Sequence, residues 1–255
     1  MAGLYDLSIM LPIFYTSPEN IKDDLAVLSG EEAHHLRKVL RLTKGEGALV
    51  VDGCGNAYRS QIEVIAEKTV QCRIFAPIRN FGEPMHFVTL AAGISTGYKF
   101  DEVIEKGTEL GVSRFVPVIT EKAKVRIDDE ISQKRKMERW RKVAIAAVKQ
   151  CGRSFIPILE APVLFDKLFS LSNLGQAIIF DPSATGRPFE EFNPDLEQKY
   201  FTIIVGSESG FTAGELKLAT EKMAAAVSLG ARILRTENAG PTAAGLLMFR
   251  LNEFR

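Results

Sequence analysis

The chain has 255 residues, of which 46% are hydrophobic and 25% are charged, and its formal net charge is +0. These values are typical of a soluble globular protein of one or two domains, and without an apolar run of ~18 residues no transmembrane helix is expected. Balanced charge gives no overall attraction to nucleic acid or to a membrane surface, so any basic binding surface would have to be local.

The first 80 residues have the pattern of short strands around one helix. A helical face is predicted at 30–40, and strands are predicted at 48–51, 58–65 and 70–75. The Asp-Gly turn in residues 52–56 separates two alternating runs, as in a hairpin. We therefore predict a small β-barrel over residues 1–80, which ends in the breaker-rich segment 79–84.

From residue 85 onward, strand patterns alternate with helical patterns. Strands are predicted at 85–91, 114–119, 176–181, 201–205 and 225–229. Helices are predicted at 99–110, 131–151 and 242–254, with a further helical pattern after Thr212. This alternation predicts an α/β domain over residues 81–255, built on a parallel sheet with crossover helices.

The predicted helix 131–151 is strongly basic. Its cations, with one just beyond its end, are Lys134, Arg135, Lys136, Arg139, Arg141, Lys142, Lys149 and Arg153. A solvated surface helix would carry such charges, and so would a surface that contacts the phosphate backbone of a nucleic acid. Arg37, Lys38, Arg41 and Lys44 in the first domain could extend a surface of the second kind.

Two strand-to-helix connections near the C-terminus suit a polar or anionic ligand. Residues 206–210 follow one predicted strand and residues 229–236 follow another. Backbone N–H groups at the starts of the following helices would point at such a ligand. Ordinary connections in a parallel sheet would have the same spacing, so this pattern alone leaves both interpretations open.

The cysteines and histidines give no metal or disulfide pattern. The sequence contains three cysteines, which are far apart: Cys54, Cys72 and Cys151. Their small, odd number fits a reducing cytoplasm. His34 and His35 are adjacent and cannot share a helix face as an i,i+4 metal pair would. The first ten residues carry Asp6 and lack a basic region, so we expect no secretory signal and a cytoplasmic protein.

Several short motifs occur in the order and spacing of one known family. They lie at residues 32–42, 99–101, 106–112, 139–140, 150–153 and 229–237. On these motifs the chain resembles the SPOUT superfamily of trefoil-knot RNA methyltransferases over nearly its whole length. Within it, the chain is most similar to the family that methylates N3 of a uridine in 16S ribosomal RNA. The resemblance implies a PUA-like, RNA-binding β-barrel over residues 1–80, a SPOUT domain with a deep trefoil knot over residues 81–255, and a homodimer.

The resemblance also implies S-adenosylmethionine as cofactor, with no metal, because the sulfonium methyl is already electrophilic. The implied cofactor-binding residues are Phe180, Asp181, Gly206, Ser207, Glu208, Gly210, Leu229, Gly230, Ile233, Leu234, Arg235 and Thr236. The apolar members of this set would suit an adenine ring, although a leucine in such a run is by default a core residue.

The implied partner is 16S rRNA of the small ribosomal subunit, with no membrane. The RNA-binding residues would be Arg37, Lys38, Arg41, Lys134, Arg135, Arg139, Lys142 and Arg153. Uridine N3 carries a proton at neutral pH, so donors facing the uridine oxygens would stabilise the developing negative charge. Arg153 and Arg235 are the candidates for that catalytic role, and Glu237 is the candidate carboxylate for the proton.

Four positions depart from the family pattern. Ser207 and Ser209 stand where the family has Pro and Gly, Asn238 stands where it has Thr, and Ile13 stands where Arg is common. A serine at 209 would be strained if that position needs a positive φ. The departures leave two alternatives open: a non-catalytic RNA-binding relative, or a methyltransferase for another RNA site.

Overall fold

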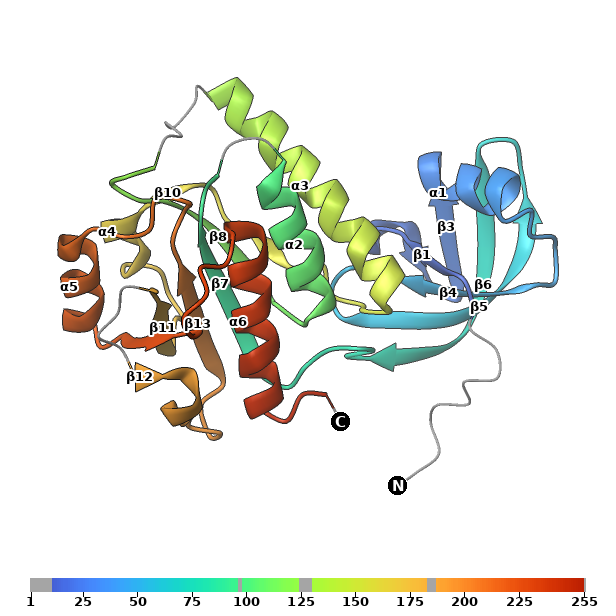
Figure 1. Ribbon diagram of the computed structural model, residues 1–255. Helices are drawn as coiled ribbons and strands as arrows, with labels where there is room; N and C mark the ends of the chain where they lie inside the picture. The colour runs from blue at the N-terminus through green and yellow to red at the C-terminus, as the bar shows by residue number, and fades with distance from the viewer. Residues whose placement is uncertain (1–10, 96–97, 124–129, 183–186, 255) are drawn as a thin grey trace. The chain divides into compact units, whose positions relative to one another are not determined.

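The computed structural model describes residues 11–95, 98–123, 130–182 and 187–254. The chain divides into two compact units (Figure 1). One unit comprises Met1–Glu83 with Val148–Ile156, and the other comprises Pro84–Ala147 with Pro157–Arg255. Residues 148–156 therefore pack with the first unit, although they lie in the range 81–255 predicted for the second domain.

The first unit is a six-stranded sheet in the order β1-β4-β5-β6-β3-β2. Its strands are β1 (Ile13–Tyr15), β2 (Ile21–Lys22), β3 (Leu25–Ser29), β4 (Gly47–Val51), β5 (Asn56–Ile65) and β6 (Thr69–Arg79). Its helical segments are η1 (Pro18–Asn20), α1 (Gly30–His34) and the π-helical turn η2 (His35–Val39). Register shifts interrupt the β5–β6 ladder, and such bulges bend a strand, as a curled sheet requires.

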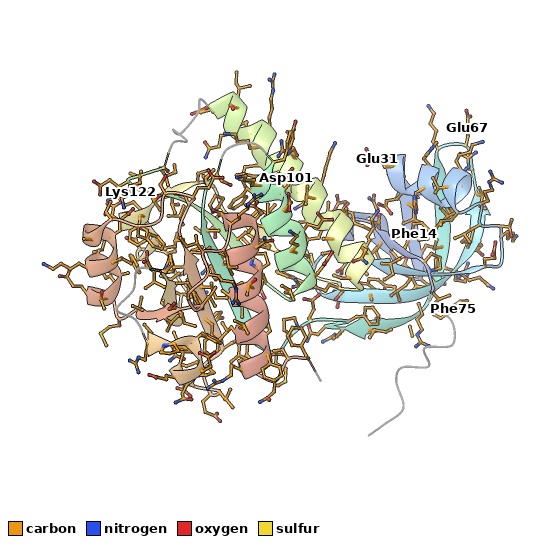
Figure 2. All side chains as sticks on the ribbon, viewed as in Figure 1. Phe14, Glu31, Glu67, Phe75, Asp101 and Lys122 are labelled. Atoms are coloured by element: carbon orange, nitrogen blue, oxygen red, sulfur yellow. The ribbon has the colours of Figure 1, made fainter. Side chains whose placement is uncertain are left out.

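One apolar cluster holds this sheet to its helix. Phe14 from β1 (labelled in Figure 2) and Leu36 from η2 are fully buried in it. Leu28, Val50 and Ile62 are buried in the same cluster. Alternate residues of each strand supply these side chains, which is the period-2 pattern of a half-buried strand. The predicted helix and strands of the first 80 residues thus share one core.

Residues 148–156 complete the first unit through the carboxylate of Glu83. Its Oε2 accepts a hydrogen bond from Nη2 of Arg153 at 2.8 Å. Its Oε1 accepts from the backbone N–H groups of Ser154 at 2.8 Å and Phe155 at 2.7 Å. The side chains of Arg153 and Glu83 are 3% and 10% exposed, so this is a buried ion pair with several hydrogen bonds.

The second unit is built on an eight-stranded parallel sheet in the order β10-β8-β7-β13-β11-β14-β12, with β9 paired to β8. Its strands are β7 (Phe87–Gly93), β8 (Arg114–Ile119), β9 (Ile158–Leu159), β10 (Val163–Leu164), β11 (Gln176–Phe180), β12 (Arg187–Pro188), β13 (Tyr200–Val205) and β14 (Ala225–Ser228). Its helical segments are α2 (Lys99–Glu109), α3 (Glu130–Cys151, which ends in the first unit), α4 (Phe165–Leu168), η3 (Phe189–Glu191), α5 (Ala213–Glu221) and α6 (Thr236–Arg250). The predicted parallel sheet is confirmed.

The last helix corrects one prediction. It was expected to begin at residue 242, after the Gly-Pro pair, but α6 begins at Thr236 and contains Pro241. Gly240 and Pro241 are buried, and a Cβ on Gly240 would lie 3.1 Å from the side chain of Leu90 on β7. The Gly-Pro pair therefore lies inside the helix, where it lets α6 approach the sheet closely. The same helix also lies beside α2 (Figure 1).

Candidate active site

The candidate site lies where three neighbouring parallel strands end. In the sheet, β11 is paired with β13 on one side and with β14 on the other. The carboxyl ends of these strands are followed by Asp181, Gly206 and Leu229. In an open α/β sheet, ligands bind in the crevice outside the carboxyl ends of the strands, so this edge is the expected place for a ligand.

A cavity of about 780 Å³ opens at this edge. It is lined by all of the residues that the sequence analysis put forward for cofactor binding: Phe180, Asp181, Gly206, Ser207, Glu208, Gly210, Leu229, Gly230, Ile233, Leu234, Arg235 and Thr236. It is also lined by Lys99, Lys122, Pro182, Val205, Ser209, Phe211, Arg232 and Ala239, which were not in that set. Its volume lies within the range of roughly 300–1,000 Å³ that small-molecule sites occupy.

Backbone contacts shape the first glycine loop. A Cβ on Gly93 would lie 2.2 Å from the backbone nitrogen of Ser207, so β7 and this loop touch main chain to main chain. The Ser207 hydroxyl lies 3.2 Å from the hydroxyl of Thr120, just beyond β8. The loop closes with a bond from the Gly210 N–H to the Ser207 carbonyl, and Gly210 has a φ of +64°. Ser209 is not among the described residues with positive φ, so the strain considered for that serine does not arise.

The cavity carries charges of both signs. Lys99, at the start of α2, is bonded to Glu208 in the glycine loop, and this bond raises the pKa of Lys99. Lys122 donates to the Phe211 carbonyl at 2.9 Å, which leaves its charge on the cavity wall. Asp181 is 4% exposed and follows β11 directly. Such a cavity can hold a ligand that itself carries both cationic and anionic groups.

The apolar wall is partly open to solvent. Leu229 and Leu234 are partly exposed, and Ile233 is 82% exposed. These residues are therefore available to a ligand and are not core residues. An apolar wall beside a few polar groups is the usual composition of a small-molecule site.

The start of α6 brings Arg235 and Glu237 together. Arg235 is the N-cap residue, and its side chain is 81% exposed where it lines the cavity. Glu237 is 8% exposed and lies in the first helical turn, where the helix dipole favours a negative charge. Its Oε1 is 4.0 Å from Nη1 of Arg235, and its Oε2 is buried without a hydrogen-bond partner among the described residues. Glu237 itself is not a lining residue, although Thr236 and Ala239 beside it are.

Other predicted residues lie outside the cavity. Arg153 is 2% exposed and bonded to Glu83 in the first unit, so its placement is that of a structural ion pair and not of a surface RNA contact. In the same unit, Arg37 donates to the Glu67 carbonyl and Arg41 has a φ of +56°. The exposed or half-exposed cations of α3 that remain from the predicted set are Lys134, Arg135, Arg139 and Lys142.

Sequence reasoning missed the two lysines of the cavity as ligand contacts. Lys99 was noted only as part of a family motif, and Lys122 follows β8, whose end was not recognised as part of the site. The available signal was position, since both residues come shortly after strands of the same parallel sheet. Among the described residues no cluster of three or more His, Cys, Asp or Glu side chains suits a metal ion. No described helix has the length and apolarity needed to cross a membrane.

Comparisons with known proteins agree with this geometry. The family described as "RNA methyltransferase domain" matches residues 82–248, and the one described as "RNA methyltransferase PUA domain" matches residues 28–75. Ribosomal RNA small subunit methyltransferase E of Synechocystis is 32% identical over 89% of this chain and 74% of its own length. The protein of the same name from Buchnera aphidicola is 32% identical over 92% of this chain and 94% of its own.

Two solved structures share the fold of nearly the whole chain. A Legionella pneumophila protein in complex with the bound cofactor SAM has a TM-score of 0.84 and 31% identity, and covers 94% of this chain and 98% of its own. Ribosomal RNA small subunit methyltransferase E of Neisseria gonorrhoeae, bound to S-adenosyl methionine, has a TM-score of 0.82 and 27% identity, and covers 94% and 97%.

Proposed function

The chain belongs to the RNA methyltransferase family, and on that basis we propose that it transfers a methyl group from S-adenosylmethionine to N3 of a uridine in 16S ribosomal RNA. The observation that carries the proposal is the cavity at the ends of β11, β13 and β14, which gathers every residue expected to touch the cofactor. Relatives named for small-subunit rRNA and bound to this cofactor support the choice of substrate and cofactor.

The residues of the cavity fit S-adenosylmethionine. The apolar wall of Leu229 and Leu234 suits the adenine ring, while Asp181 and Glu208 suit the cationic groups. Lys122 and the N–H groups at the start of α6 suit the carboxylate. When bound, S-adenosylmethionine supplies an electrophilic methyl group, so the remaining tasks of the protein are to position the uridine and to manage the proton on N3.

Arg235 and Glu237 are the residues to which we assign those tasks. The exposed guanidinium of Arg235 can donate to a uridine oxygen, which stabilises negative charge as the N3 proton leaves. The buried Oε2 of Glu237 has an unused acceptor position, and because Glu237 does not line the cavity it would take that proton through a bridging water. Their separation of 4.0 Å lets each hold the other's charge in place before the substrate arrives.

The RNA itself would lie on basic side chains of both units. The α3 cations Lys134, Arg135, Arg139 and Lys142 and the first-unit cations Arg37, Lys38 and Arg41 support this part of the proposal. Such contacts position a nucleic acid without reading its sequence. Because relatives are named for small-subunit ribosomal RNA, small ribosomal subunits are the proposed partner, in the cytoplasm. Arg153 is left out of the proposed contact set because its side chain is buried.

We further propose a homodimer and a trefoil knot. On α6, Leu246 and Phe249 are 39% and 69% exposed and lie three residues apart on one helix face, whereas Leu247 and Leu251 are buried in the core. An exposed apolar pair on a helix favours a second copy as its cover. The support for the knot is the resemblance of the motifs at residues 99–112 and 229–237 to the SPOUT superfamily. An experimental structure tests the knot, because the traced backbone shows whether the C-terminal segment passes through a loop of the same chain.

The methylation experiment uses purified protein, S-adenosylmethionine and small subunits reconstituted from unmodified 16S transcript. A methyl group on uridine N3 blocks base pairing, so a new reverse-transcription stop and an N3-methyluridine in the digested RNA are the expected results. A methyl group at another nucleotide would replace the proposed substrate by a different RNA site. RNA binding without cofactor binding would replace the enzyme by a non-catalytic RNA-binding relative.

A further inference from the structure

An exposed aromatic ring lies under the guanidinium of the basic helix. Tyr98 is 73% exposed, although it directly precedes α2 and its carbonyl accepts a bond from the N–H of Asp101. The guanidinium carbon of Arg139 lies 4.2 Å from the centre of the Tyr98 ring. Cation–π contacts extend to about 6 Å, so the two groups are closely stacked while the ring remains largely open to solvent.

Both members of this pair are held by packed elements. Asp101 of α2 (Figure 2) forms an ion pair with Arg139, with its Oδ1 2.6 Å from Nη2, and the Asp101 side chain is only 19% exposed. Next to Asp101 and Arg139 in the sequence, the buried rings of Phe100 and Trp140 lie 4.7 Å apart and join α2 to α3. The orientation of Arg139 over Tyr98 is therefore fixed before any ligand binds, which lowers the entropy lost on binding.

The position of the pair connects the cavity with the basic helix. Tyr98 is followed by Lys99, which lines the cavity. On α3, Arg135, Arg139 and Lys142 are spaced four and three residues apart, so they share one helix face. An RNA backbone that followed this face would pass the ring of Tyr98, and the next residue in the sequence, Lys99, lines the cavity.

We infer that Tyr98 and Arg139 form a stacking platform for an unpaired nucleobase next to the methylated uridine. This inference rests on the proposed function, because it needs RNA at the cavity. Unpaired RNA bases commonly stack on tyrosine rings and on arginine guanidinium planes. Here Arg139 covers one face of the Tyr98 ring, so a base would stack on the other face. The platform would hold the RNA strand so that the neighbouring uridine can enter the cavity.

The test compares Tyr98→Ala and Tyr98→Phe with the unchanged protein. Loss of the ring should raise the KM for reconstituted small subunits by about 5- to 150-fold, the range expected for one base–aromatic stack. Tyr98→Phe keeps the ring and should stay within about 2-fold of the unchanged protein. The cofactor Kd should not change in either variant, since Tyr98 does not line the cavity, and an unchanged Kd also shows that the variant is folded.

A matched control is Met223→Ala. Met223 is 87% exposed in the same unit, between α5 and β14, and its loss should leave the KM for small subunits unchanged. A purely structural cation–π pair predicts lower thermal stability for Tyr98→Ala with an unchanged KM for RNA. That result would overturn the platform.

A binding measurement separates failure of the platform from failure of the proposed function. The probe is a short unstructured RNA carrying one 2-aminopurine, whose emission falls when the base stacks. The unchanged protein and Tyr98→Phe should quench it, and Tyr98→Ala should quench it less. Equal quenching by all three would overturn the platform even if methylation occurs. Quenching that depends on Tyr98 would sustain the platform even if no methylation of uridine N3 were found.

Discussion

The α-carbon of Gly93 faces the backbone nitrogen of Ser207 so closely that a Cβ at residue 93 would lie 2.2 Å from it. Residue 93 ends β7 and residue 207 lies in the glycine loop after β13, so the contact joins the sheet to the wall of the cavity. Only hydrogen fits between them, because real Cβ atoms do not approach backbone atoms to this distance.

Gly93→Ala should therefore disturb the cofactor site. The loop must shift away from β7, with an overpacking cost of about 1–3 kcal/mol and at least a ~10-fold loss of S-adenosylmethionine affinity. Calorimetric titration measures the affinity, and urea unfolding measures the stability. The control is Gly214→Ala at an exposed position of α5, where the nearest atom would be 3.7 Å away and neither quantity should fall. Unchanged affinity in Gly93→Ala would show that the loop does not bind the cofactor.

The glycine loop should respond differently at two neighbouring positions. Gly210 has a φ of +64°, and alanine is strained in that conformation. Gly210→Ala should therefore lower the free energy of unfolding by about 1–2 kcal/mol and weaken the free energy of cofactor binding by about the same amount. Ser209→Gly should change the affinity by less than about 2-fold, because residue 209 does not need a left-handed backbone. Calorimetry of both variants decides the matter. A large gain in affinity from Ser209→Gly would show that the serine does impair this site.

Glu237→Gln should slow methyl transfer while leaving the protein folded. Glutamine keeps the shape of the side chain but is not a base, so kcat should fall by roughly 10²- to 10⁴-fold. The cofactor Kd should stay within about 2-fold, since Glu237 does not line the cavity. Single-turnover rates with reconstituted small subunits measure the effect. An unchanged rate would remove Glu237 from the proton transfer and leave it a role in holding Arg235.

Phe249→Asp should convert the proposed dimer to a monomer. Phe249 is 69% exposed, and a charge at the centre of an apolar interface is costly when it is buried without a partner. Sedimentation velocity should show one species at half the mass of the unchanged protein. The matched variant Met223→Asp, at an exposed residue outside α6, should leave the mass unchanged. A monomeric unchanged protein would contradict the proposed dimer directly.

The buried Cys72 should make stability fall in alkali. Burial raises the pKa of the Cys72 thiol from 9.0 to about 11, so the unfolded chain loses this proton at a lower pH than the folded chain does. The free energy of unfolding is therefore unaffected below pH ~9 and falls by roughly 1–3 kcal/mol as the pH rises toward 11. Urea unfolding at several pH values should show this slope, and Cys72→Ala should lack it. An equal slope in both proteins would assign the effect to other groups.

Much of the sheet could be predicted because its strands are continuous apolar runs. The cofactor residues could be predicted to meet because they follow such runs, and parallel strands bring their carboxyl ends to one edge. The start of α6 could not be predicted, because the pair Gly240-Pro241 has the sequence pattern of a helix break. The close contact of Gly240 with Leu90, which explains the glycine, is known only from the structure. The burial of Arg153 depends on Glu83, which lies far away in the sequence, and no local pattern reports such a partner. The short strands β9, β10 and β12 are likewise set by tertiary pairing.

The return of residues 148–156 to the first unit bears on how the chain folds during synthesis. When a ribosome has released only the segment up to Glu83, that carboxylate lacks the partners that Arg153, Ser154 and Phe155 later supply. The N-terminal unit can reach its final stability only after α3 has emerged. A fragment that stops at Glu83 should accordingly be less protected from proteases than the same residues in the whole chain.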